Sequence, residues 1–150
     1  MLFALMLSLV WIEVPSQELP FEVSKIACSN SLAADSTSPG WSAVPIGLAQ
    51  NRWTMEFKLL NRSDKQITAL HWAFRFRDKS GKTVVQEFKS KRNIKPGKDS
   101  IIKETFIFDA ASMPSPITGT ILLRQVDFSD GSTWLPDPSD PDSGTVLVKP

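Results

Sequence analysis

The side chains that could carry out chemistry are concentrated in one short segment. Leu70–Gly81, which reads LHWAFRFRDKSG, contains the only histidine of the chain, His71, together with a tryptophan, two phenylalanines and two arginines. A histidine could act as a base for a serine or for the single cysteine, Cys28, and aromatic rings beside arginines could stack on nucleic-acid bases. A stacking platform would need its rings and its cations on one exposed face.

The order of residues in this segment favours a strand with two different faces. One set of alternate residues is apolar and consists of Leu70, Trp72, Phe74 and Phe76. The other set contains His71, Arg75 and Arg77. Because successive side chains of a strand point to opposite faces, the aromatic rings are predicted to enter a core while the histidine and arginines face outward. The chain also has no Gly-x-Ser-x-Gly motif, so we expect no enzyme, and a small hydrolase using His71 is the weaker alternative.

Metal and phosphate sites are not indicated either. One histidine and one cysteine cannot close a four-ligand zinc site. Asp137, Asp140 and Asp142 could offer oxygen ligands to calcium, but interposed prolines and the lack of the glycine and glutamate of a calcium loop favour a solvated acidic spacer. The glycine spacing of a phosphate loop is also missing. We therefore expect no metal and no other cofactor.

The charge of the chain is unevenly distributed. The net charge is only +1, yet residues 52–104 carry fourteen Lys and Arg against six Asp and Glu, and the remainder is acidic. Outward cations on neighbouring strands would form one basic surface, and the candidate ligand-binding residues are Arg75, Arg77, Lys89, Lys91 and Arg92. Such a surface could bind an anionic glycan, a lipid surface or an acidic protein segment. Alternatively, Glu56 and Glu87 could screen a merely solvated face. Nucleic acid is not expected, because the overall charge is near neutral.

The N-terminal residues 1–16 are interpreted as a signal peptide. Their apolar run, Leu2–Ile12, is too short to span a bilayer comfortably, and Val14 and Ser16 suit the small positions before a cleavage site. This predicts export to the periplasm, the cell surface or the extracellular space, and no transmembrane span. A buried first strand is the alternative. Cys28 has no second cysteine to pair with and is expected to be a half-buried strand thiol.

Residues 17–136 are predicted to form a β-sandwich, followed by an acidic, proline-rich tail over 137–150. Period-two alternation and turn residues place strands within 17–28, 52–59, 69–77, 83–91 and 100–109, with a hairpin over 117–136, and further edge strands near Ser42–Val44 and over 145–150. A type II turn is expected at Pro96–Gly97 and a two-residue turn at Asp130–Gly131. About seven strands without an amphipathic helix indicate an all-β, antiparallel, immunoglobulin-like β-sandwich.

The turn residues of the chain resemble those of bacterial envelope domains of the immunoglobulin-like or FxLYD-like type. The matching residues are Asn61, Ser63, Ile67, Asp78, Gly81, Ile94, Pro96 and Gly97. About fifty residues are covered, and the aromatic-x-Leu-aromatic-Asp signature of the FxLYD group is missing. The resemblance implies a small exported β-sandwich without known catalytic residues, and it transfers no site to this chain.

These observations lead to one functional expectation and one main alternative. We expect a non-catalytic, exported binding or structural module of the cell envelope, which binds an anionic ligand through its basic sheet face. In the alternative, the chain is a subunit of a surface assembly or self-associates, with Val146, Leu147 and Val148 pairing with a neighbouring sheet edge by strand addition.

Overall fold

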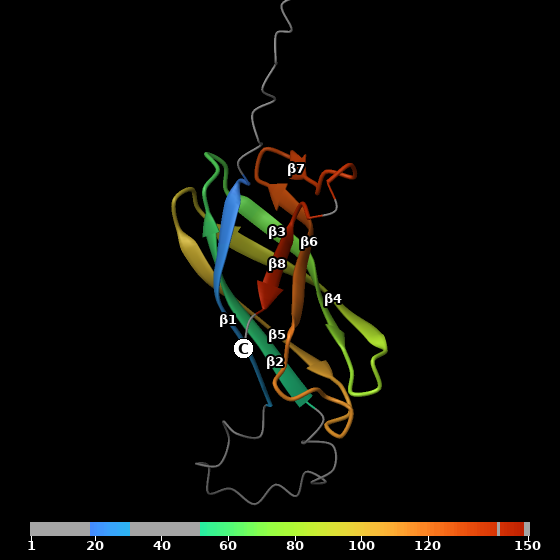
Figure 1. Ribbon diagram of the computed structural model, residues 1–150. Coiled ribbons are helices and arrows are strands. Elements are labelled where there is room, and N and C mark those ends of the chain that lie inside the picture. The colour runs from blue at the N-terminus through green and yellow to red at the C-terminus, as the bar shows by residue number, and fades with distance from the viewer. Residues whose placement is uncertain (1–18, 31–51, 141, 149–150) are drawn as a thin grey trace, which may run out of the picture.

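The chain folds into two antiparallel β-sheets packed face to face (Figure 1), in a computed structural model that describes residues 19–30, 52–140 and 142–148. The strands are β1 (Phe21–Asn30), β2 (Arg52–Asn61), β3 (Ile67–Arg77), β4 (Thr83–Ile94), β5 (Asp99–Ile107), β6 (Gly119–Phe128), β7 (Thr133–Trp134) and β8 (Thr145–Val148). The predicted all-β sandwich is therefore confirmed. The described ranges contain no helix that is long and apolar enough to cross a membrane.

The order of the strands is that of an immunoglobulin-like sandwich. The first sheet has the order β1-β2-β5, and the second has the order β4-β3-β6, with β7 and β8 both pairing with β6. In immunoglobulin letters these are A-B-E and C′-C-F-G. The chain changes sheets between β2 and β3, between β4 and β5, and between β5 and β6. Consequently β4 and β5 are the edge strands on one side of the sandwich.

The core forms between the two sheets, and the aromatic residues of β3 supply much of it. Trp72 and Phe74 are fully buried, and Leu70 and Phe76 are 1% and 2% exposed. The Trp72 ring meets Phe57 of β2 edge to face, with 4.8 Å between ring centroids. The predicted inward face of this strand is thus confirmed, and the polar residues of β3 are left on the outside of the second sheet.

Several local predictions need correction. The turn after β6 is a three-residue loop rather than a two-residue turn, because the Phe128 N–H donates to the Ser132 carbonyl (2.9 Å) and Gly131 takes a φ of +81°. The strand expected over 83–91 extends to Ile94, because its polar end pairs with β3. The first strand starts and ends later than predicted.

Other predictions agree with the fold or lie outside the described residues. The Lys98 N–H donates to the Lys95 carbonyl, and Gly97 has a φ of +69°, as a type II turn at Pro96–Gly97 requires. The last edge strand is present as β8 and pairs with β6 of its own chain. The signal peptide over 1–16 and the edge strand near Ser42–Val44 lie outside the described residues.

Candidate functional site

The candidate site is the outer face of the second sheet, where β3 lies between β4 and β6. The strand register arranges the outward side chains in rows across the three strands. His71 lies between Lys89 and Gln125, and the preceding outward residue, Ala69, lies between Lys91 and Asp127. Farther along β3, Ala73 lies beside Glu87, Arg75 lies beside Val85, and Arg77 lies beside Thr83. The structure therefore brings Arg75, Arg77, Lys89 and Lys91 to one face, and all four are exposed.

Arg92, the fifth predicted residue, does not belong to this face. Lys91 and Arg92 are consecutive in the strand, so their side chains leave β4 on opposite sides. Arg92 is only 22% exposed and donates a hydrogen bond of 2.8 Å to Glu104 on β5 of the other sheet. The prediction that all five cations share one surface is wrong at this position, and alternation along the strand already argued against it.

Among the residues that the structure describes, the four cations of the face have no ion-pair partner, whereas several other cations of the chain have one. Within the described ranges, the salt bridges use Lys58, Arg62, Lys65, Arg92, Lys103, Arg124 and His71 as their basic members. Neither arginine of β3, and neither Lys89 nor Lys91, has a carboxylate within 4.0 Å in that set.

One carboxylate interrupts the basic face. Glu87 accepts a hydrogen bond from His71 Nε2 at 2.9 Å and lies 3.6 Å from the guanidinium of Arg124. It occupies the row between the two arginines of β3 and the two lysines of β4. The cations consequently form two groups along the sheet, with Glu87 between them. We call Arg75 and Arg77 the arginine group, and Lys89 and Lys91 the lysine group. Glu56, the other carboxylate considered for screening, lies on the first sheet and pairs with Lys103 instead.

The arginine group continues into the turn between β3 and β4. Lys79 and Lys82 of this turn are exposed. The carboxylate of Asp78 accepts hydrogen bonds from the Ser80 hydroxyl (2.6 Å) and from the N–H groups of Ser80 and Lys82, and these bonds hold its pKa below the usual range. Asp78 is thus ionised but committed to its own turn. The sequence RFRDKSGK of residues 75–82 contains all four of these cations. From the sequence alone it indicates only a strand followed by a turn.

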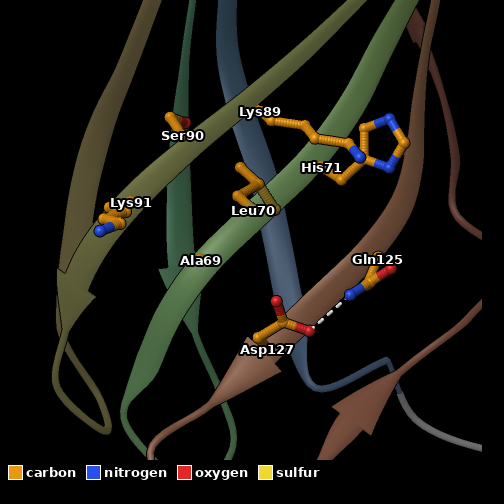
Figure 2. A pocket seen from close by; sticks show the side chains of 8 residues that line it. All are labelled: Ala69, Leu70, His71, Lys89, Ser90, Lys91, Gln125 and Asp127. Atoms are coloured by element: carbon orange, nitrogen blue, oxygen red, sulfur yellow. Dashed lines mark hydrogen bonds between the residues drawn. The ribbon is translucent and has the colours of Figure 1, made fainter.

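A shallow hollow of about 370 Å³ adjoins the lysine group (Figure 2). Its floor includes Ala69, whose methyl group leaves space between the longer side chains of the flanking strands. Lys89 and Lys91 line it from β4, and Gln125 and Asp127 line it from β6. Asp127 accepts hydrogen bonds from Gln125 (2.7 Å) and Thr133 (3.0 Å), so its Oδ1 atom is already used. A bound group would meet ammonium groups on one side and this carboxylate on the other.

The histidine of the face and the cysteine of the chain are far apart in the fold. The His71 side chain is 27% exposed and interacts with Glu87 on the outer face of the second sheet. Cys28 lies on β1 of the other sheet, packs against the core and is half-buried, as predicted. Burial raises the pKa of this thiol to about 11. A Cys–His pair is therefore not formed.

Two of the three aspartates of the C-terminal segment, Asp137 and Asp140, use their carboxylates within the loop that contains them. Asp137 Oδ1 accepts hydrogen bonds from the N–H and hydroxyl of Ser139, at 2.8 and 2.6 Å, and Asp140 Oδ1 accepts one from the Asp142 N–H. These bonds shape the loop that separates β7 from β8. Across the part of the chain that the structure describes, no group of three or more His, Cys, Asp or Glu is placed to hold a metal ion.

Comparisons with known proteins identify no family for this chain. No protein-family model matches the sequence, and no curated protein matches it. Target SoR45 of the Northeast Structural Genomics Consortium is similar to the chain, with 11% identity, a TM-score of 0.46, and coverage of 87% of this chain and 83% of the target. A Bordetella pertussis target provisionally named ApaA has 9% identity and a TM-score of 0.43, with 87% and 90% covered.

A third similar structure is a much larger protein. It is a β-D-glucoside glucohydrolase from Trichoderma reesei, with 17% identity and a TM-score of 0.36. The similarity covers 77% of this chain but only 18% of that enzyme. With TM-scores below 0.5, these similarities assign neither a family nor an activity to this chain.

Proposed function

We propose that the chain is a non-catalytic binding module of the cell envelope that recognises an acidic glycan through the outer face of its second sheet. The observation that carries the proposal is the set of four exposed cations on this face that have no ion-pair partner among the described residues. An unpaired cation attracts an anionic ligand without first giving up an intramolecular partner. The envelope location rests on the family resemblance of the turn residues and on the signal-peptide pattern.

The spacing of the cations favours an extended polyanion over a small anion. Arg77 and Ala69, which lies beside Lys91, are separated by eight residues of β3, or about 26 Å at the usual rise of a strand. A single carboxylate or phosphate would contact only the arginine group or only the lysine group. A chain of uronate units could contact both groups and pass Glu87 between them.

Binding should depend on these positions and not on net charge alone. We would titrate the protein with alginate, a polyuronate, at low salt and compare Arg75→Gln/Arg77→Gln with the matched control Lys95→Gln/Lys98→Gln. Both variants lose two positive charges, and Lys95 and Lys98 are exposed cations of the β4–β5 turn. We expect the first variant to weaken binding about tenfold and the control to change it little, with affinity falling as salt is added.

Three results would decide against the proposal or redirect it. Equal losses in both variants would show attraction by net charge only, and an affinity that is insensitive to salt would rule out a basic site. Binding to vesicles containing phosphatidylglycerol or to poly-glutamate, but not to alginate, would replace the glycan by a lipid surface or an acidic protein segment. Lys89→Gln/Lys91→Gln should weaken binding as the arginine variant does if the ligand spans both groups.

A further inference from the structure

The edge strand β5 exposes two isoleucines on its outer face, with Lys103 and Thr105 between them, and the proposed binding function does not use this strand. β5 pairs with β2 on one side and with no other strand among the described residues. Ile101 and Ile107 on its outer face are 61% and 72% exposed, the latter being the most exposed of the large apolar side chains described. A free edge with apolar side chains is a template for pairing with another strand.

The backbone of β5 has a defined set of groups directed toward this edge. At the end of β2, the Asn61 N–H donates to the Lys98 carbonyl, so Asn61 directs its backbone toward β5. Because the hydrogen-bonding direction alternates along an antiparallel ladder, residues 100, 102, 104 and 106 face β2, and residues 101, 103, 105 and 107 face away from it. The exposed isoleucines are therefore among the residues whose N–H and C=O groups point to the open edge.

We propose that β5 pairs antiparallel with β5 of a second copy, across a twofold axis at Glu104 that sets Ile101 opposite the partner's Ile107. This register buries two isoleucine pairs on the outer face and sets Lys103 opposite Thr105 of the partner subunit. An axis at Lys103 would place two ammonium groups directly opposite each other. An axis at Thr105 would place Lys103 against an isoleucine, so both alternatives are less favourable.

The axis at Glu104 also places two carboxylates opposite each other on the inner side of β5, and Arg92 of the same chain compensates each of them. Glu104 accepts a hydrogen bond from Arg92 at 2.8 Å, and the two side chains are 28% and 22% exposed. Arg92 Nε is buried and has no hydrogen-bond partner among the described residues. Across the axis, two Arg92–Glu104 pairs would form a neutral cluster of four charges, in which this N–H could reach the partner's Glu104.

The two sides of the sandwich also differ in how they are closed. On the side of β1, Phe21 packs edge to face on Trp134, with 4.7 Å between ring centroids. On the side of β4 and β5, a groove of about 550 Å³ is present, and it is lined by Phe88, Phe106 and Ile107 together with the polar residues Arg52, Gln86, Glu87 and Thr105. A second copy paired along β5 would cover this groove. We therefore place the self-association surface on the side of β4 and β5.

The oligomeric state tests the proposal. We expect sedimentation velocity of the wild-type protein to show a concentration-dependent dimer, and Ile101→Lys/Ile107→Lys to raise the dimer dissociation constant about 100-fold or more. Leu135→Lys is the matched control, because Leu135 is as exposed as Ile101 at 61% but lies in the loop after β7, and it should leave the dimer intact. A wild-type monomer at all concentrations, or a dimer that survives the double substitution, would overturn the proposal.

Disulfide trapping tests the register independently of affinity. In a Cys28→Ser background, Ile101→Cys and Ile107→Cys chains should each fail to cross-link alone under mild oxidation, but should form a heterodimer when they are mixed. This follows because each position faces the other position, and not itself, across the axis. Efficient cross-linking of Lys103→Cys with itself, or no cross-link in the mixture, would contradict the proposed pairing. Circular dichroism would confirm that each variant is folded.

Discussion

The side-chain amide of Asn61 donates a hydrogen bond to the carbonyl oxygen of Ile94, 2.9 Å away, and so joins the end of β2 to the end of β4. Asn61 is fully buried. Its Nδ2 group also donates to the Lys65 carbonyl at 2.7 Å, and its Oδ1 atom accepts from the Ser63 N–H and hydroxyl. Both side-chain amide hydrogens of Asn61, the first residue of an Asn-x-Ser sequence, therefore donate hydrogen bonds within the fold. They do so where the chain leaves the first sheet and enters the second.

Replacing Asn61 should be costly. Asn61→Asp keeps the shape but turns a donor into a buried anion facing two carbonyl oxygens. Asn61→Ala removes the side-chain donor to the Ile94 carbonyl and leaves the Lys65 carbonyl with the Ser63 hydroxyl, 2.9 Å away. We expect a loss of about 2–4 kcal/mol in the free energy of unfolding, measured by urea denaturation. Asn93→Asp is the control, since Asn93 is exposed on β4, and it should change stability little. Equal midpoints for Asn61→Asp and Asn93→Asp would contradict this role.

Lys25 has a backbone conformation that its residue type does not favour. It lies in the bulge of β1 between Ser24 and Ala27, and its φ is +51°. For an L-residue with a Cβ atom this region costs about 1–2 kcal/mol, whereas glycine adopts it readily. We expect Lys25→Gly to raise the free energy of unfolding by about 1 kcal/mol.

A β-branched residue at the same position should act in the opposite direction. Lys25→Ile should lower stability relative to wild type, because a β-branched side chain is the least tolerant of a positive φ. Lys58→Gly would be a poor control for Lys25→Gly, because Lys58 is ion-paired with Asp99 and the substitution would also remove that interaction. Ser29→Gly, at an exposed strand position without a positive φ, should be destabilising and serves as the control. A loss of stability in Lys25→Gly would refute the bulge conformation.

Gly119 at the start of β6 has no room for a side chain. A Cβ atom there would lie 2.5 Å from the Phe74 ring and 2.6 Å from the carbonyl oxygen of Arg75. Gly119→Ala should therefore force β6 away from β3 and reduce stability by about 1–3 kcal/mol, measured as a fall in the urea midpoint. Thr118→Ala, at the exposed preceding residue, should have a small effect. A Gly119→Ala protein as stable as Thr118→Ala would contradict the close packing.

The half-buried thiol of Cys28 should react slowly and should titrate at a higher pH than an ordinary cysteine. With a pKa of about 11, the folded protein holds much less thiolate at pH 8 than an unfolded chain does. We expect alkylation by iodoacetamide to be about tenfold slower or more in buffer than in urea at this pH, after allowing for the greater nucleophilicity of a high-pKa thiolate. In the folded protein the rate should keep rising between pH 9 and pH 11, where the unfolded chain levels off. A plateau near pH 9 in the folded protein would contradict this.

The raised pKa of Cys28 also makes the stability of the fold depend on pH. Folding favours the neutral thiol, so its contribution to stability is fully present below the unfolded pKa of about 9, and it is lost as the pH rises through that value toward 11. Cys28→Ser should remove this part of the alkaline decline in the urea midpoint. If the urea midpoint of Cys28→Ser falls at alkaline pH as much as that of the wild-type protein, the fall is caused by other titrating groups.

Much of the fold could be predicted from residue order, because a half-buried strand imposes a period of two on its sequence. This alternation predicts the burial of Trp72 and Phe74 in the core, and it also predicts the outward positions of Arg75 and Arg77. The turns at Asp78–Gly81 and Pro96–Gly97 could also be located, because Asp, Pro and Gly stabilise turns through local geometry. These features depend only on residues that are close together in the chain.

The bulges were also marked in the sequence, although their meaning became clear only with the fold. In β1 the inward residues change from Phe21 and Val23 to Ile26 and Cys28, and this change of parity occurs at the bulge. In β6, Leu123 and Val126 both reach the core, because the register with β3 shifts between His71 and Trp72. An extra residue in one strand restores the alignment of apolar faces.

Which charges meet across the sheets was decided by tertiary structure alone. Residue order alone is enough to predict the alternating strands, the turn residues and a central segment rich in cations. Only the packing of β4 beside β5 brought Arg92 to Glu104, and only the pairing of β3 with β4 placed Glu87 between two groups of cations. Such contacts join residues that are distant in the chain, and the strand order that creates them cannot be predicted from any local pattern of residues.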